Sequence, residues 1–161
     1  MITDNLARAH WQKLVWNIPF NGLGVASAAG YEALIAPHSA PTAAHPERLR
    51  AAATLTTDQL LADARWAQPV RDLTLEVIAA ARALGFDIRD ALADKQIERT
   101  RTMGAYRAST LIDFERGQPL ELESLFLEPL RQATQAGVAM PRLSALCAVL
   151  QELDRRARAA R

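Results

Sequence analysis

Three polar side chains recur at every fourth position near the start of the chain: Lys13, Asn17 and Asn21. Because an α-helix has about 3.6 residues per turn, this spacing places a lysine and two amides in one stripe along a single helix. Large apolar residues flank the stripe on both sides, so the helix is expected to be buried almost all round. A row of donors on such a helix suits a small polar anion, such as a hydroxy acid.

An alternative interpretation of the stripe stays open on spacing alone. The stripe could face solvent, or its amides could bond to a neighbouring helix. Buried polar groups need partners of one kind or the other, because an unsatisfied one costs about 1–3 kcal/mol. Lysine in particular is seldom fully buried. The spacing therefore predicts either a ligand site or an internally bonded polar row.

A second candidate segment runs from Ser109 to Glu123. It has the pattern of a short helix to Glu115, a turn at Gly117 and a new helix that begins near Leu120. Glu121 and Glu123 are expected in the first turn of that helix, where carboxylates also complement the helix dipole. By itself, this segment does not distinguish a site from ordinary helix capping.

Helices must position these residues, because alanine and leucine dominate the sequence and β-branched residues are sparse. The first helix is expected to begin near Asp4 or Asn5 and to reach about Ala29, with a kink or a loosened turn at Pro19. No segment shows convincing strand alternation. Further helices are expected at 59–63, 66–84, 87–103, 109–115, 120–136 and 141–158. The sequence therefore predicts an all-α fold.

Prolines mark the weak points of this helical pattern. The stretch from Ala36 to Pro46 contains three prolines and is expected to be a loop. Pro46 can open a short helix that continues to Ala52. Pro129 is expected to kink or divide the helix at 120–136. We therefore expect irregular backbone between the first helix and residue 56.

Length and charge restrict the function classes. The 161 residues carry a net charge of +1 and are 50% hydrophobic, which fits one domain with one core. This balance gives no overall attraction to nucleic acid. The arginines at the end of the chain suit the negative pole of a helix dipole. They are Arg155, Arg156, Arg158 and Arg161.

The remaining composition favours a cytoplasmic protein. Cys147 is the single cysteine, and it lies in an apolar helical stretch, so a buried structural thiol is expected. The polar N-terminus does not resemble a signal peptide. The apolar stretch 15–36 contains a proline, two asparagines, three glycines and Glu32, so no membrane span is expected there. No metal site is expected, because His38 and His45 have no third ligand at suitable spacing.

Gly22, Gly24 and Ser27 form part of a pattern that looks like a dinucleotide-binding motif. That motif requires a turn from a strand into a helix, whose amides face the diphosphate. Here the glycines follow a helix, no strand precedes them, and serine occupies the third glycine position. We therefore reject a nucleotide site at these residues.

Three motifs in this order resemble the C-terminal domain of the ketopantoate reductase family. The first is Trp11-Gln12-Lys13-Leu14 with Asn17 and Asn21, and the second is the segment from Ser109 to Glu123. The third, Gly137-Val138-Ala139-Met140-Pro141, resembles the loop before the last helix of that family. The resemblance covers nearly the whole chain. It implies a helical bundle-like domain similar to the C-terminal domain of 6-phosphogluconate dehydrogenase.

The resemblance also implies a function. Members of this family reduce 2-dehydropantoate to pantoate with NADPH, in pantothenate biosynthesis. Lys13 matches the lysine that contacts the keto oxygen and supplies the proton, and Glu121 matches the acid that holds the substrate hydroxyl and orients that lysine. Asn17 and Asn21 match substrate-binding asparagines, and Ser109 matches a serine on the substrate carboxylate. A cation beside a ketone oxygen stabilises the negative charge that hydride addition creates there.

The chain departs from the family pattern in three places. An apparent insertion from about Gly30 to Leu55 could reshape the pocket. Tyr106 stands where some members carry an asparagine near the carboxylate, and Met140 replaces a threonine. Because small pocket changes decide specificity, the substrate could be another 2-keto acid.

The resemblance predicts a missing partner domain. The N-terminal Rossmann domain that binds NADPH is not found in this sequence, so the chain is expected to be inactive alone and to bind no cofactor by itself. An excised or a stand-alone domain would both fit. Some self-association, for example as a homodimer, is expected. A non-enzymatic helical module that binds a small acid or mediates dimerisation is the competing hypothesis.

Overall fold

The computed structural model describes residues 2–35 and 54–160, and it contains no strand in these two ranges. The predicted all-α fold is therefore confirmed. Its elements follow one another as α1 (Ile2–Ala26), η1 (Ser27–Ala29), α2 (Tyr31–Ile35), α3 (Thr57–Ala62), α4 (Ala64–Ala83), α5 (Ala91–Arg101), α6 (Ser109–Glu115), η2 (Glu123–Leu127), α7 (Glu128–Gln135) and α8 (Pro141–Ala159).

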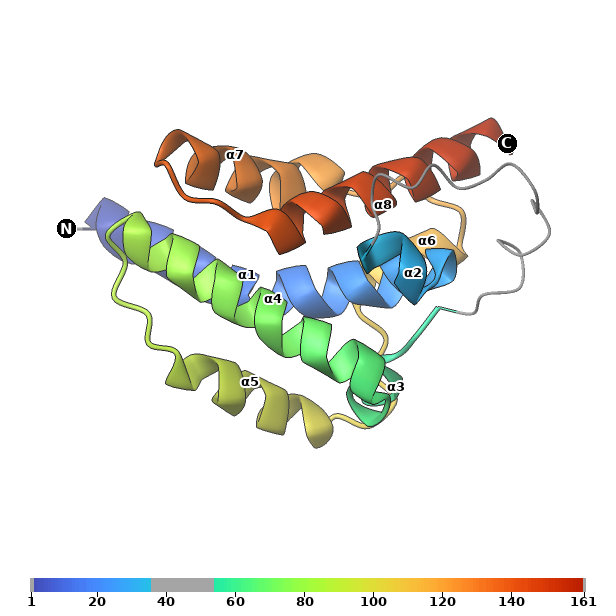
Figure 1. Cartoon of the computed structure of the whole chain (residues 1–161), viewed down its shortest axis with the longest axis horizontal. Coiled ribbons are helices and arrows are strands. Elements are labelled where there is room, and N and C mark those ends of the chain that lie inside the picture. The colour runs from blue at the N-terminus through green and yellow to red at the C-terminus, as the bar shows by residue number, and fades with distance from the viewer. Residues whose placement is uncertain (1, 36–53, 161) are drawn as a thin grey trace.

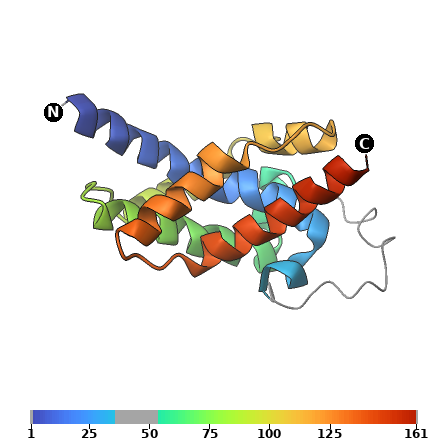
Figure 2. The ribbon, with the colours of Figure 1, turned by 90° about the horizontal axis from the view of Figure 1, so that it is seen from above.

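Helix α1 is the central element, and it packs chiefly against α4 (Figure 1). In this view α7 and α8 lie above α1 and α5 lies below it. Seen from above, α2 and α6 lie on opposite sides of the end of α1 (Figure 2). The second half of α1 is consequently covered on several sides, as its apolar composition predicts.

The course of α1 differs in detail from the expectation. It runs through Pro19 as one α-helix and ends at Ala26. The last predicted turn, Ser27–Ala29, is a 3-10 helix that is followed by Gly30. Gly30 has a φ of 87°, a conformation that glycine adopts without strain. A short helix, α2, follows at Tyr31 and was not predicted. The described residues do not include the predicted loop after Ala36, its histidines His38 and His45, or the short helix predicted from Pro46.

Capping explains where α3 and α4 begin. The Thr56 N–H donates to the Gln59 side chain at 3.0 Å, and this capping box starts α3 at Thr57, two residues before the predicted start. The Asp63 carboxylate accepts from the Arg65 N–H at 2.9 Å and starts α4 at Ala64, two residues before the predicted start. Both caps are short-range features that a sequence can reveal.

The predicted helix at 87–103 is wrong at its start, because α5 begins only at Ala91. After the turn at Gly85, the Phe86 N–H bonds back to the Ala81 carbonyl, and Ile88 is buried in the core. This apolar anchor holds residues 86–88 in an irregular conformation, so helical geometry starts later.

The helix predicted at 120–136 is likewise divided. A π-helical turn, η2, precedes α7, which starts at Glu128 with Pro129 in its first turn. The proline cannot donate the helical hydrogen bond, so a kink or division was expected here; the structure shows a change from π-helical to α-helical geometry at Glu128, with no non-helical residue between η2 and α7. Leu120 is not helical, because its N–H donates at 3.0 Å to the buried Asp154 of α8.

Helix α8 begins at Pro141 as predicted, but its cap comes from another helix. The Glu76 carboxylate on α4 accepts from the Arg142 N–H at 3.0 Å and from the Leu143 N–H at 2.8 Å. Burial raises the pKa of Glu76, although these two backbone hydrogen bonds oppose the shift. This cross-helix cap ties α8 to α4 at the start of α8.

Candidate functional site

The polar stripe of α1 changes its surroundings along the helix. Lys13 is exposed, Asn17 is half-buried, and Asn21 is only 3% exposed. The spacing predicted one continuous stripe, and the fold gives its three members different environments. Lys13 and Asn17 can meet a ligand, whereas Asn21 lies in the interior.

Asn21 joins α1 to the start of α6. Its Oδ1 atom accepts from the Thr110 N–H at 3.0 Å and from the Ser109 hydroxyl at 3.4 Å. Its amide nitrogen lies 3.5 Å from the Asn17 oxygen, a long hydrogen bond. Since the Thr110 N–H is one of the donors that α6 cannot satisfy internally, Asn21 acts as a cap in trans. The structure thus brings Asn17, Asn21 and Ser109 together.

An open cleft of about 540 Å³ lies along the exposed side of the stripe. Lys13 and Asn17 line it from α1, while Gln96 and Arg99 line it from α5. The remaining lining residues are Ala9, Gln12, Trp16, Met103 and Tyr106. This volume is in the range of small-molecule sites. The cleft is therefore the candidate site.

Trp16 organises the wall of the cleft. Its indole N–H donates at 2.9 Å to the Thr100 hydroxyl on α5, and that hydroxyl donates at 2.6 Å to the Gln96 carbonyl. The Trp16 ring stacks on Phe20 with centroids 5.2 Å apart and meets Tyr106 edge-on at 6.0 Å. A partly buried hydrogen bond and two aromatic contacts thus set how α5 and the following loop face α1.

Glu121 is not brought into this arrangement. Its side chain is exposed, it does not line the cleft, and it has no hydrogen bond or ion pair with any other described residue. Its neighbour Glu123 forms an ion pair with Arg131 at 2.6 Å. The predicted catalytic pair of Lys13 and Glu121 therefore remains a prediction.

The sequence reasoning missed the cleft residues on α5. Gln96, Arg99 and Met103 lie on or just after an ordinary amphipathic helix, and no spacing distinguishes them from solvent-facing residues. Tyr106 was noted only through the family resemblance. A signal for these residues would have required knowing that α5 faces the stretch of α1 from Ala9 to Asn17 across the cleft.

The glycines of the rejected nucleotide motif have a packing role. A Cβ atom on Gly22 would lie 2.5 Å from a Leu146 methyl and 2.9 Å from the Phe126 ring. On Gly24 it would lie 3.0 Å from the Leu55 carbonyl oxygen. Both glycines lie within α1, so their amides serve the helix and do not fit a diphosphate.

Other site types can be assessed within the described ranges. Residues 2–35 and 54–160 hold no cluster of three or more potential metal ligands. None of the described helices has the length and apolar character needed to span a bilayer. Cys147 is buried as predicted, and burial raises the pKa of its thiol to about 12, so it is not an activated nucleophile.

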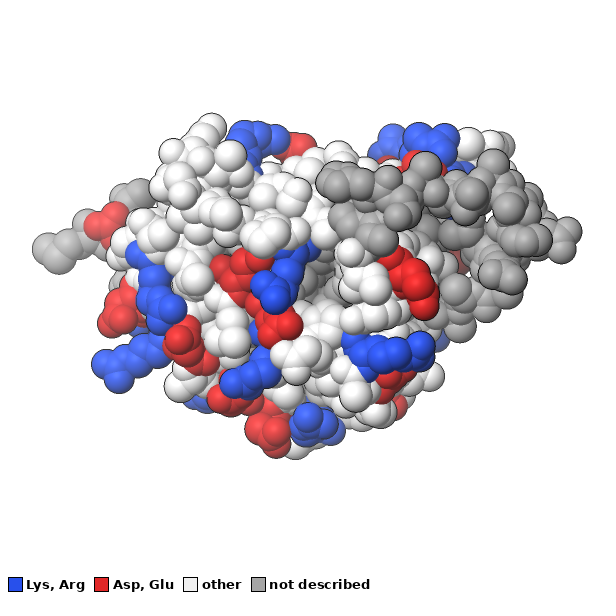
Figure 3. Space-filling model, viewed as in Figure 1, with Lys and Arg blue, Asp and Glu red and all other residues white. Residues whose placement is uncertain are grey.

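The arginines near the C-terminus are neutralised locally. Arg155 and Arg156 pair with Glu152 at 2.8 and 2.5 Å, and Arg158 pairs with Asp154 at 2.7 Å. These hydrogen bonds lower the pKa of Glu152 to about 2. On the face shown in Figure 3, basic and acidic side chains are intermixed.

Comparison with known proteins places this geometry in a family. A family model for the ketopantoate reductase PanE/ApbA C terminal matches residues 43–154. A 2-dehydropantoate 2-reductase from Nostoc is 32% identical over 157 residues, which is 98% of this chain and 41% of the relative. This chain belongs to the ketopantoate reductase family.

Solved structures agree with the assignment to ketopantoate reductases. The crystal structure of 2-dehydropantoate 2-reductase from Geobacter metallireducens is 37% identical, with a TM-score of 0.70 over 91% of this chain and 41% of that chain. The enzyme from Methylococcus capsulatus is 29% identical, with a TM-score of 0.73 over 94% of this chain and 44% of that chain. The chain thus spans about two fifths of the length of these relatives. The polar stripe precedes the family-model match and is covered by the whole-chain similarity.

Proposed function

We propose that this chain is the substrate-binding domain of an NADPH-dependent 2-dehydropantoate 2-reductase. The observation that carries the proposal is that Lys13 and Asn17, two of the residues matching the family site, line one open cleft. Asn21 donates a long hydrogen bond to Asn17, and the exposed Ser109 donates one to Asn21, so both residues are linked to the residue that lines the cleft. Family membership supports the reaction type, and the cleft supplies the place for it.

The proposed chemistry uses the side chains of the cleft. NADPH, when bound, supplies a hydride to the ketone carbon of the substrate. The ammonium of Lys13 faces the ketone oxygen, stabilises the developing negative charge and donates the proton. Asn17 contributes a further hydrogen bond and is itself bonded by Asn21, while Asn21 and Ser109 are proposed as substrate-binding residues on the family resemblance. Glu121 is proposed as the second catalytic residue on the family resemblance alone.

In this proposal, the nucleotide is held by a separate Rossmann domain and not by residues 1–161. The glycines of α1 are enclosed by α8, η2 and Leu55, so they do not cradle a diphosphate. We infer that the chain alone is inactive and that the reaction needs both domains. A reductase for a different 2-keto acid is the second candidate, and Tyr106 at the cleft favours it, because it differs from the asparagine of some relatives.

The first test is a calorimetric titration of the chain with pantoate. Wild type should bind the acid weakly, and Lys13→Ala should lose about tenfold or more in affinity, as expected for a charge-assisted hydrogen bond. Lys95→Ala is the matched control, because Lys95 is exposed on α5 and does not line the cleft. Equal affinity in all three proteins would contradict the assignment of Lys13.

The second test measures the reaction. When the chain is joined to an NADPH-binding domain, it should oxidise NADPH in the presence of 2-dehydropantoate, and Lys13→Ala should reduce kcat by about 10²–10⁴. A panel of branched 2-keto acids identifies the preferred substrate. Absence of NADPH oxidation with every 2-keto acid would favour the competing hypothesis of a non-enzymatic binding module.

A further inference from the structure

The cleft presents two cations and no acidic residue. Lys13 and Arg99 line it from facing helices, and its other polar side chains are the neutral Gln12, Asn17, Gln96 and Tyr106. Neither cation forms an ion pair or a side-chain hydrogen bond with another described residue. Two unpaired cations that line one small concave site form a binding site for an anion.

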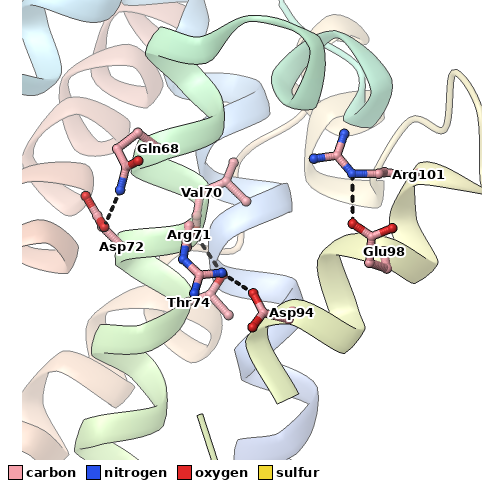
Figure 4. A network of polar contacts seen from close by, with 8 residues as sticks. All are labelled: Gln68, Val70, Arg71, Asp72, Thr74, Asp94, Glu98 and Arg101. Atoms are coloured by element: carbon pink, nitrogen blue, oxygen red, sulfur yellow. Dashed lines mark hydrogen bonds and ion pairs between the residues drawn. The ribbon is translucent and has the colours of Figure 1, made fainter. Parts of the chain in front are cut away.

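Neighbouring arginines on the same surface behave differently. Arg101 lies two residues after Arg99 and pairs with Glu98 at 3.2 Å, while Arg71 of α4 pairs with Asp94 of α5 (Figure 4). Arg99 and Arg101 both lie in the last turn of α5, where a cation complements the helix dipole. The helix dipole therefore explains why an arginine lies at each of these two positions. It does not explain why Arg99 has no acidic partner among the described residues while Arg101 has one.

The fold fixes where Arg99 stands. The next residue, Thr100, is 0% exposed and accepts the hydrogen bond from Trp16. Because successive helical residues are about 100° apart around the axis, burial of Thr100 against α1 leaves Arg99 at the edge of this contact. The hydrogen bond between Trp16 and Thr100 therefore fixes the position of Arg99 relative to the stripe that carries Lys13 and Asn17.

We propose that Arg99 binds the carboxylate of the small acid whose oxygen at carbon 2 contacts Lys13. This inference rests on the proposed function and adds a residue that determines specificity. A guanidinium matches a carboxylate with two parallel hydrogen bonds, which a lysine cannot supply. The edges of Trp16 and Tyr106 leave apolar surface for the carbon skeleton of the acid. A phosphate has the same anionic chemistry, so the test must separate the two.

The experiment removes the positive charge of Arg99 and the negative charge of the ligand carboxylate, each alone and both together, and compares the affinities. Calorimetry compares pantoate with its neutral carboxamide on wild type, Arg99→Gln and Arg99→Lys. Wild type should prefer the acid, and Arg99→Gln should lower the ratio of acid to amide affinity about tenfold while leaving amide binding nearly unchanged. Arg99→Lys should recover part of the ratio, and Arg101→Gln, the matched control, should keep the wild-type ratio.

Each outcome decides between the proposals. If Arg99→Gln weakens acid and amide equally, or neither, the assignment of Arg99 is wrong while the proposed function stands. If, in the same calorimetry, Arg99→Gln weakens the binding of inorganic phosphate and leaves acid binding unchanged, the arginine serves a phosphate and the inference is overturned. If wild type binds neither ligand, the proposed substrate site itself fails, and the role of Arg99 fails with it.

Discussion

The two halves of α1 share one helix and one polar spacing, but they do different things. The half that carries Lys13 and Asn17 borders an open cleft and meets α5 through the single hydrogen bond of Trp16. The half from Ile18 to Ala26 is buried throughout and packs against α4, α6, α8 and η2. The comparison teaches that helical spacing decides which residues share a face, and that neighbouring elements decide what the face is for.

The division has a physical cause. Gly22 lets α8 and η2 approach the backbone of α1 closely, and the oxygen of Asn21 satisfies the start of α6. Among residues 2–35 and 54–160, the side of α1 that carries Lys13 borders the open cleft instead. We therefore expect substitutions in the buried half to change stability and substitutions in the cleft half to change binding.

The largest expected effect comes from Phe20→Ala. Phe20 is 1% exposed and stacks on Trp16, so truncation should lower the free energy of unfolding by about 3–5 kcal/mol. Urea denaturation followed by circular dichroism measures this loss. Lys13→Ala is the control in the cleft half and should change stability by less than about 0.5 kcal/mol. If both variants lost similar amounts of unfolding free energy, the two halves of α1 would not differ in their contribution to stability.

Gly22→Val tests the close approach of α8. The added side chain would collide with Leu146 and Phe126, and such overpacking should cost about 1–3 kcal/mol. The same denaturation experiment applies. Ala9→Val places the same side chain on an exposed position of α1 and should cost less than about 1 kcal/mol. A neutral Gly22→Val would show that α8 can move away without cost.

Asn21→Ala and Asn17→Ala test whether the two asparagines of the stripe have different roles, one in stability and one in binding. Removing Asn21 leaves the buried Thr110 N–H without its acceptor and should cost about 1–3 kcal/mol of stability. Asn17→Ala should weaken pantoate binding and change stability by less than about 0.5 kcal/mol. Parallel denaturation and calorimetry measure both. If Asn21→Ala lost binding without losing stability, Asn21 would be a ligand contact and not a cap.

The smallest effect concerns thiol reactivity. Burial raises the pKa of Cys147 to about 12, so iodoacetamide at pH 8 should leave it unmodified in the folded protein. In Ala9→Cys the added cleft thiol should react, and mass spectrometry should find one label and not two. Since the pKa of the folded protein's thiol lies above its ordinary value of 9.0, the stability contributed by the neutral thiol is complete below pH 9 and declines as pH rises toward 12. Rapid native labelling of Cys147 would contradict its burial.

Local signals predicted most of the helices. The cap at Thr56, the turn at Gly85 and the change of helix type near Pro129 act within a few residues, so their effect can be recognised in sequence, whereas Asp63 was expected inside a helix and its role as the cap of α4 was missed. The late start of α5 was not predictable in the same way, because burial of Ile88 in the core decides it. The cap on α8 from Glu76 spans 66 residues, and no local pattern encodes it.

The sequence by itself determined the polar stripe, the helical class and the family, because each depends on residue type and on spacing along one chain segment. Only the tertiary structure decided that Asn21 is buried behind the cleft and that Arg99 lines its opposite side. The contacts responsible join Asn21 to Thr110 and Trp16 to Thr100, across 89 and 84 residues. Such pairings arise when separate helices pack on one core, so the other wall of the site cannot be read from the helix that carries the stripe.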